Sequence, residues 1–308
     1  MPPLTLSPSR WRDAVRQIED LGFYSVSVSE HLTHGWQMDP MAAMMAAADA
    51  TERLRVLSLV LANDFRHPVL LHKAAATIDV LSAGRLELGL GAGWMADDYI
   101  GAGLRFDSPR VRIERLAESI TILKGLFGPR PFTFNGTHYH VSELDGLPKP
   151  GQRPHPPILI GGGGKAMLSL AAREADIVGV HCRLHEGTLS PEAAADFEPE
   201  RIAEKVGWVR QTAHAAGRDF ESIDLQFTVY FCRVTQTSTE AETASSSFAD
   251  LLRKDPALMA SSPAVLTGTV DQCAETLCER REQYGFSYLK LSGDLANLAP
   301  LVARLAGR

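Results

Sequence analysis

The chain has no basic tract, no long apolar run and no paired cysteines. Its 31 lysines and arginines face 37 acidic residues, and the net charge of −6 is spread along the sequence, which argues against a nucleic-acid surface or an anionic membrane patch. The longest fully apolar run, residues 41–48, is far too short to span a bilayer. The four cysteines show neither CxxC spacing nor the density of a secreted scaffold, so free thiols are expected. These absences favour a cytoplasmic protein that acts on a small molecule.

Glycines gather at two places where a strand pattern ends. The sequences LSAGRLELGLGAGW, residues 81–94, and PILIGGGGK, residues 157–165, each place glycines directly after a short apolar strand. Backbone without large side chains can approach a ligand closely, so Gly91, Ala92 and Gly93 are candidate cofactor contacts. We therefore expect an enzyme built around a phosphorylated cofactor.

The second glycine-rich turn carries the clearer anion-binding pattern. Consecutive backbone amides followed by a helix N-terminus suit a phosphate group on a cofactor, with a flexible loop as the alternative interpretation. The pattern is not that of an NTP-hydrolysing P-loop, because no serine or threonine follows the lysine. The candidate phosphate contacts are Gly161, Gly162, Gly163, Gly164 and Lys165.

Strand and helix patterns alternate along the chain with a spacing of about thirty residues, which is typical of repeated βα units and a parallel sheet. The length of 308 residues fits either one α/β barrel or two ordinary domains. Helices are expected at residues 67–83 and 109–127, and Thr269 with Gln272 predicts a capping box at the start of another. The seven expected strands cover residues 25–29, 55–61, 86–90, 158–160, 177–180, 225–231 and 288–292.

A barrel of eight strands needs one more strand before the first helix, where only residues 2–6 are available. Two prolines there predict a first strand that is short or missing, so either the chain starts too far downstream or the barrel closes imperfectly. Two insertions, residues 95–155 and 235–262, follow strands 4 and 7 and are expected over the barrel mouth. The predicted fold class is α/β, a TIM (β/α)8 barrel formed as a single domain by residues 1–308.

The order of motifs resembles the luciferase-like monooxygenase superfamily. The segments that carry the resemblance are SVSVSEH, VLANDFRHP, LSAGRLELGLGAGW, RIERLAESITILKGLF, PPILIGGGG and GTVDQCAETL. Within the superfamily, VLANDFRHP is most similar to the branch that uses the deazaflavin coenzyme F420 in place of FMN. The resemblance implies a luciferase-like TIM barrel, a bound flavin-like ring, redox chemistry on an organic substrate, and a homodimer or other homo-oligomer. It also implies that a non-proline cis peptide can occur near Val60.

Glu30 and His31 follow the strand at residues 25–29, where a barrel presents its catalytic side chains. Histidine can exchange a proton near neutral pH. In similar F420 enzymes an acidic residue and a histidine contact the ring and assist proton transfer, which makes Glu30 and His31 the candidate catalytic pair. The acid is more often aspartate in those enzymes, so Glu30 departs from the pattern. A structural histidine that caps a loop is the alternative for His31.

Asn63 and Trp94 are the remaining candidate cofactor contacts. The Asn63 amide offers a donor and an acceptor to a pyrimidine-type ring, with turn chemistry as the alternative. Asp64 and Arg66 are expected to be structural. Trp94 is expected to flank the ring or the substrate. The sugar-phosphate dehydrogenases among the F420 enzymes have a carboxylate where this chain has the Trp94 indole, so that activity is not expected.

Two further clusters are ambiguous. His181, Cys182 and His185 offer metal-ligand types, yet no second cluster completes a zinc sphere, so no metal is expected. Arginines at the start of the helix at residues 109–127 either meet the acidic tail of F420 or form a solvated face with Glu114 and Glu118. These arginines are Arg105, Arg110, Arg112 and Arg115.

The sequence therefore predicts an F420-dependent oxidoreductase that transfers a hydride between a small organic substrate and the deazaflavin ring. One alternative is an FMN-dependent monooxygenase that uses oxygen and reduced flavin from a separate reductase. A second alternative is a non-catalytic F420-binding protein.

Overall fold

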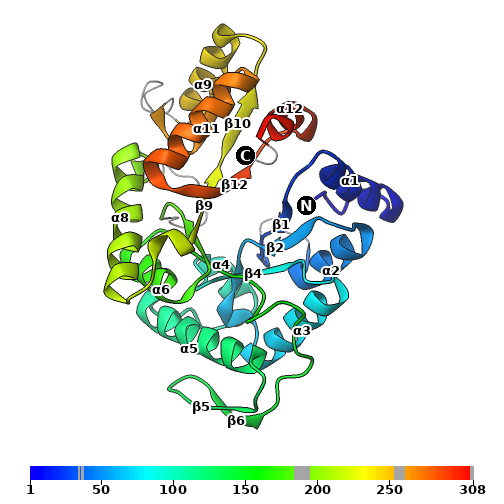
Figure 1. Ribbon diagram of the computed structural model, residues 1–308, viewed down its shortest axis with the longest axis vertical. Coiled ribbons are helices and arrows are strands. Elements are labelled where there is room, and N and C mark those ends of the chain that lie inside the picture. The colour runs from blue at the N-terminus through cyan, green and yellow to red at the C-terminus, as the bar shows by residue number, and fades with distance from the viewer. Residues whose placement is uncertain (34, 36–37, 184–194, 253–260, 306–308) are drawn as a thin grey trace. The chain divides into compact units, whose positions relative to one another are not determined.

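The computed structural model describes residues 1–33, 35, 38–183, 195–252 and 261–305. The chain divides into two compact units, which we call unit 1 (Met1–Gly161) and unit 2 (Gly162–Arg308). In each unit, parallel strands alternate with helices along the chain (Figure 1). This is the repeat that the sequence pattern predicts, and a strand lies at each of the seven expected places, although those at residues 55–61 and 225–231 are interrupted.

The strands of unit 1 form a parallel sheet in the order β1, β2, β4, β7, with the two-residue β3 paired to β4. Every residue of β4 is buried, as expected for a parallel strand with both faces covered. The predicted strand at residues 55–61 is interrupted by a cis peptide between Leu59 and Val60. The strands are β1 (Ser25–Val28), β2 (Arg55–Ser58), β3 (Leu61–Ala62), β4 (Leu86–Gly91) and β7 (Ile158–Gly162).

Proline begins four of the five helices described in unit 1, because its fixed φ suits the first helical turn and its missing N–H is not needed there. At the second helix the Asp39 carboxylate also accepts a hydrogen bond from the Ala42 N–H at 2.8 Å. The helices are α1 (Pro8–Asp20), α2 (Pro40–Ala50), α3 (Pro68–Leu81), α4 (Ala96–Gly101) and α5 (Pro109–Phe127).

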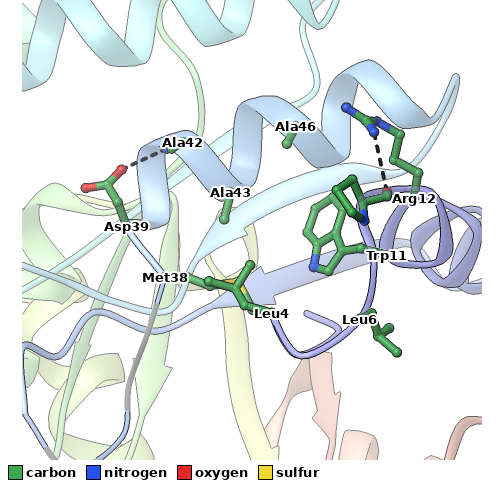
Figure 2. Close-up of a pocket in the computed structure, with 10 residues that line it drawn as sticks. Leu4, Leu6, Trp11, Arg12, Met38, Asp39, Ala42, Ala43 and Ala46 are labelled. Atoms are coloured by element: carbon green, nitrogen blue, oxygen red, sulfur yellow. Dashed lines mark hydrogen bonds between the residues drawn. The ribbon is translucent and has the colours of Figure 1, made fainter.

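Residues 1–7 form turns and no strand, as their prolines predict. The Trp11 indole N–H donates to the Pro2 carbonyl at 3.1 Å, and the Met1 ammonium donates to the Ser27 carbonyl at 3.1 Å. Figure 2 shows the side chains around a largely apolar cavity of about 370 Å³ beside this segment, where Leu4 and Trp11 face Ala43 of α2. Residues 1–7 therefore pack against α1 and α2 without regular secondary structure.

The insertion at residues 95–155 is largely ordered. It contains α4, α5 and an antiparallel hairpin of β5 (Phe132–Asn135) and β6 (His140–Leu144) that the sequence did not predict. The Glu118 carboxylate of α5 accepts hydrogen bonds from the N–H groups of Thr137, His138 and Tyr139. These bonds tie the hairpin turn to the helix.

In unit 2 the parallel strands β8, β9 and β12 lie in that order. The capping box at Thr269 and Gln272 is confirmed. The strands are β8 (Ile177–Val180), β9 (Asp224–Val229) and β12 (Phe286–Leu291), and the helices are α6 (Lys165–Glu174), α8 (Pro199–Ala215), α9 (Ser238–Leu252), α11 (Val270–Tyr284) and α12 (Leu295–Leu305).

The prediction of one continuous strand over residues 225–231 was wrong. β9 ends at Val229, and β10 (Phe231–Val234) instead pairs with β11 (Val265–Gly268) in a separate two-stranded sheet. The reason is long-range, because the N–H groups of Tyr230 and Phe231 both donate to the carbonyl of Ala264. In the parts of the chain that the structure describes, no helix combines the length and apolarity needed to cross a bilayer.

Candidate functional site

The predicted site residues of unit 1 follow neighbouring strands. Glu30 and His31 follow β1, Asn63 follows β3, and Trp94 follows β4. Since these strands are parallel, their carboxyl ends share one edge of the sheet. The His31 and Trp94 rings meet edge to face, with their centroids 5.2 Å apart. The structure thus brings residues from separate sequence motifs to one place.

A buried carboxylate that the sequence did not reveal holds His31. Asp98, in α4, accepts a hydrogen bond from His31 Nδ1 at 2.8 Å through Oδ2. Its Oδ1 accepts from the N–H groups of Leu32 and Thr33, each at 2.9 Å, and from the Thr33 hydroxyl at 2.6 Å. Asp98 is 2% exposed. It therefore fixes both the histidine ring and the loop that carries it.

The electrostatics of Asp98 favour its charged form. Burial alone would raise the Asp98 pKa, but hydrogen bonds from Thr33, His31 and Leu32 outweigh burial and hold this pKa below its ordinary value. Asp98 is consequently a carboxylate at neutral pH. Because Asp98 accepts the hydrogen bond of His31 Nδ1, any proton that His31 exchanges with a bound molecule passes through its other ring nitrogen, Nε2.

Glu30 is engaged with Arg66. One Glu30 oxygen accepts from Arg66 at 3.0 Å and from the Ala62 N–H at 2.9 Å, and the other oxygen forms a second contact with the same guanidinium. Glu30 is only 5% exposed. The pair links the end of β1 to the turn after β3, in keeping with the structural role expected for Arg66.

Asn63 is 2% exposed, and its side-chain oxygen has no hydrogen-bond partner among the described residues. Its amide nitrogen donates to the Tyr139 hydroxyl at 3.3 Å. A buried carbonyl oxygen without a donor is costly, so the site favours a ligand that offers an N–H group there. Burial raises the Tyr139 pKa, so this phenol stays neutral.

The glycines at the ends of β4 and β7 lie side by side. Leu90 pairs with Ile160, so Gly91 is next to Gly161. A Cβ atom on Gly91 would lie 2.8 Å from a methyl group of Val60, and one on Gly161 would lie 3.4 Å from the other methyl group. Gly91 therefore has no room for a side chain, and the backbone at both strand ends packs closely against Val60.

The turn after β4 is supported from α5. The Arg112 guanidinium is 6% exposed and donates through Nε to the Ala92 carbonyl at 3.2 Å. Gly93 has a φ of +74°, and a Cβ atom there would lie 1.9 Å from the Tyr99 hydroxyl oxygen. Arg115 bridges Asp64 at 2.8 Å and Asp107 at 2.6 Å. These contacts fix the backbone of the candidate cofactor turn.

The arginine cluster is satisfied internally. Arg105 pairs with Asp107 at 2.7 Å, and Arg110 pairs with Glu114 at 3.2 Å across one helical turn. With Arg112 and Arg115 engaged as above, the contacts favour the structural interpretation of this cluster over a binding site for an acidic tail.

The second glycine run has three different environments in unit 2. The Gly162 carbonyl accepts from the His181 N–H at 3.0 Å, and a Cβ atom on Gly163 would lie 2.5 Å from the carbonyl of Cys182. A Cβ atom on Gly164 would meet no atom of the described residues within 4 Å. Gly164 caps α6 without a side-chain hydrogen bond, and the exposed Lys165 begins that helix. Open backbone amides beside a lysine suit an anion.

The His181 ring lies within hydrogen-bond distance of two oxygen atoms, with Nδ1 3.1 Å from the Cys182 carbonyl and Nε2 next to the Tyr230 hydroxyl. Burial lowers the His181 pKa to about 4, so the ring is neutral at physiological pH. His185 lies outside the described residues. Among the residues that are described, no group of three histidine, cysteine or acidic side chains is arranged to hold a metal.

Comparison with known proteins gives three main findings. The chain matches the family described as Luciferase-like monooxygenase over residues 3–262. It is 35% identical over 165 residues to an F420-dependent glucose-6-phosphate dehydrogenase from Microbacterium testaceum, which covers 51% of this chain and 48% of that protein. It is 33% identical over 140 residues to an FMNH2-dependent dimethylsulfone monooxygenase from Pseudomonas putida, which covers 46% of this chain and 38% of that protein.

These matches span about half the length of the curated relatives, or less. The solved structure of the monooxygenase RslO1 from Streptomyces bottropensis aligns with a TM-score of 0.76 at 24% identity, covering 99% of this chain and 94% of that chain. This likeness shows a shared fold.

Proposed function

The chain belongs to the luciferase-like monooxygenase family, and we propose that it is an F420-dependent oxidoreductase that transfers a hydride between a small organic substrate and the deazaflavin ring. The proposal rests on three features where the strands of unit 1 end: a histidine held by a buried carboxylate, a tryptophan against the histidine ring, and a buried amide oxygen that has no hydrogen-bond partner among the described residues. The motif VLANDFRHP and the F420-dependent relative support the deazaflavin. We further propose that residues 1–308 act as one domain.

The ring would lie against bare backbone and an amide. Gly91, Ala92, Gly93 and Gly161 present little side chain at the ends of β4 and β7. The Asn63 oxygen would accept a hydrogen bond from a ring N–H group, which would remove the cost of leaving it unpaired. When bound, the deazaflavin supplies a carbon centre that accepts or donates a hydride.

We also propose that the second glycine-rich turn, in unit 2, binds a phosphate group of a cofactor. Gly162, Gly163 and Gly164 supply backbone at the start of α6, and Lys165 adds a positive charge. The positive end of the helix dipole stabilises an anion at this position.

His31 would exchange the proton that accompanies hydride transfer, through Nε2, while Asp98 holds Nδ1. Trp94 would shield the reacting atoms from water because its ring lies against His31. Both Glu30 oxygens are occupied by Arg66 and the backbone of Ala62, so we assign Glu30 a positioning role in this pair.

The second candidate function is an FMN-dependent monooxygenase, which the dimethylsulfone monooxygenase relative favours. The third is an F420-binding protein without catalysis. The same backbone and the same Asn63 would hold the ring in all three cases, so the cofactor must be tested directly.

Titration of the purified chain with F420 and with FMN, followed by fluorescence quenching, tests the choice of cofactor. We expect saturable quenching with F420. Tight FMN binding with no response to F420 would overturn the proposal. Loss of turnover in His31→Ala with intact F420 binding would support catalysis, whereas unchanged turnover would remove His31 from the mechanism.

The role of Asn63 is tested with Asn63→Ala. One hydrogen bond to the ring is lost, so we expect F420 affinity to fall about three- to tenfold. The matched control is Asn135→Ala, which removes an exposed asparagine in the β5–β6 hairpin. Equal affinities in the two variants would show that Asn63 does not contact the cofactor.

A further inference from the structure

One face of the β8–β9–β12 sheet in unit 2 is polar although it is buried. In β9, Gln226 and Thr228 are 2% and 4% exposed. Their neighbours in sequence, Leu225, Phe227 and Val229, point to the opposite face and are each 1% exposed. A buried sheet face is normally apolar, so the polar side chains call for a function of their own.

The strand registers align three polar residues in one row across this face. Lys290 of β12 pairs with Thr228 of β9, and Val180 of β8 pairs with Phe227, which places His181 level with Thr228. Neighbouring strands are about 4.8 Å apart, so the row brings Lys290 and Thr228 within reach of one small ligand group. His181 lies on the other side of Thr228.

Lys290 is a half-buried cation, and no acidic partner is found for it among the described residues. Burial lowers its pKa, and no charged group among the described residues offsets this shift. Lys205 in the same unit differs, because its ammonium lies 2.6 Å from the Asp196 carboxylate. A partly desolvated ammonium without a counter-charge is unfavourable, and a bound anion would relieve that cost.

Thr228 is poised to donate to the same anion. Its hydroxyl oxygen accepts a hydrogen bond from Gln226 Nε2 at 3.3 Å, and its hydroxyl proton has no recorded acceptor in the part of the chain that the structure describes. His181 brings no competing charge, since its ring is neutral at physiological pH. The row therefore offers one ammonium and one hydroxyl donor side by side.

We propose that Lys290 and Thr228 form a binding site for the carboxylate of a small organic acid. Two oxygens of a planar carboxylate match two donors on neighbouring strands, and a charge-assisted bond to Lys290 supplies most of the affinity. This site stands independently of the proposed redox function, because it is defined by groups in unit 2 alone.

The test measures binding of benzoate to the protein without cofactor, by calorimetry, with benzamide as the neutral probe and inorganic phosphate as the competing anion. We expect benzoate to bind, benzamide to bind at least about tenfold more weakly, and phosphate to bind more weakly than benzoate. Lys290→Met should weaken benzoate binding about tenfold or more, Lys290→Arg should retain most of it, and Thr228→Val should weaken it severalfold. The exposed Lys73→Met is the charge-matched control.

Thermal unfolding separates loss of the site from loss of the fold. Lys290→Met should have an unchanged or higher Tm, because it removes an uncompensated charge. Benzoate should raise the Tm of the wild type and of Lys73→Met but not that of Lys290→Met. Benzoate affinity that is the same in Lys290→Met as in Lys73→Met would overturn the site, as would an absence of benzoate binding. Phosphate that binds more tightly than benzoate would overturn the carboxylate assignment. These measurements need no F420, so their failure is distinct from failure of the redox proposal.

Discussion

Replacing Asp98 by asparagine changes one functional group in the side chain that holds His31. The remaining Oδ1 can still accept the three hydrogen bonds from Leu32 and Thr33, so the loop should keep its place. Oδ2 becomes an NH2 group, which cannot accept a hydrogen bond from His31 Nδ1. The ring must then adopt the other tautomer or turn away, and the negative charge beside it is lost.

The expected size of the effect follows from this contact. The bond is 2.8 Å long, and Asp98 is 2% exposed, so solvent replaces little of what is lost. A hydrogen bond to a charged group contributes about 1.5–3 kcal/mol. If the His31 ring carries positive charge in the transition state, kcat should fall by about 10- to 150-fold while F420 affinity changes by less than about threefold.

Two measurements check the reasoning. Turnover is followed by the change in deazaflavin absorbance with any substrate that the wild type converts, and ¹⁵N NMR of the imidazole reports the His31 tautomer without cofactor. Asp97→Asn, at an exposed position of the same helix, is the matched control. Asp98→Asn with wild-type kcat and unchanged ring nitrogen shifts would refute the role of Asp98.

Two further predictions concern stability. Gly93→Ala should lower the free energy of unfolding by about 2–4 kcal/mol, because the added Cβ atom would clash with Tyr99 at a residue with positive φ. Gly164→Ala is the control and should change the free energy of unfolding by less than about 0.5 kcal/mol. Equal urea midpoints for the two variants would contradict this prediction. Burial lowers the His181 pKa from 6.5 to about 4, so the unfolded chain binds a proton that the native chain does not. The free energy of unfolding should therefore decline by about 1–3 kcal/mol as the pH falls from 6.5 to about 4. Urea titrations at several pH values should show a smaller decline in His181→Gln than in the wild type. The same pH dependence in both proteins would contradict the buried, neutral state of His181.

The alternation of strands and helices could be predicted because local patterns report it. Apolar strand runs, prolines at helix starts and the Thr269 capping box all depend on residues close in sequence. The cis peptide before Val60 was expected only from the family resemblance, and the β5–β6 hairpin and the pairing of β10 with β11 were missed. Each depends on partners or backbone geometry that periodicity does not encode.

The candidate site shows the same division. Position after a strand identified His31 and Asn63 as candidates, but nothing near Asp98 marked it as the partner of His31, 67 residues away. Arg112 was noted as part of a cluster, yet its bond to Ala92 required the packing of α5 against the turn.

The sequence by itself located most strands of the parallel sheet and the glycines that follow β4 and β7, because chain connectivity and glycine placement are local properties. Only the tertiary structure decided which side chains meet there. Among the residues that the structure describes, it gave His31 its carboxylate, left Lys290 without one and left the Asn63 oxygen unpaired, since burial and charge pairing arise only when distant segments pack together.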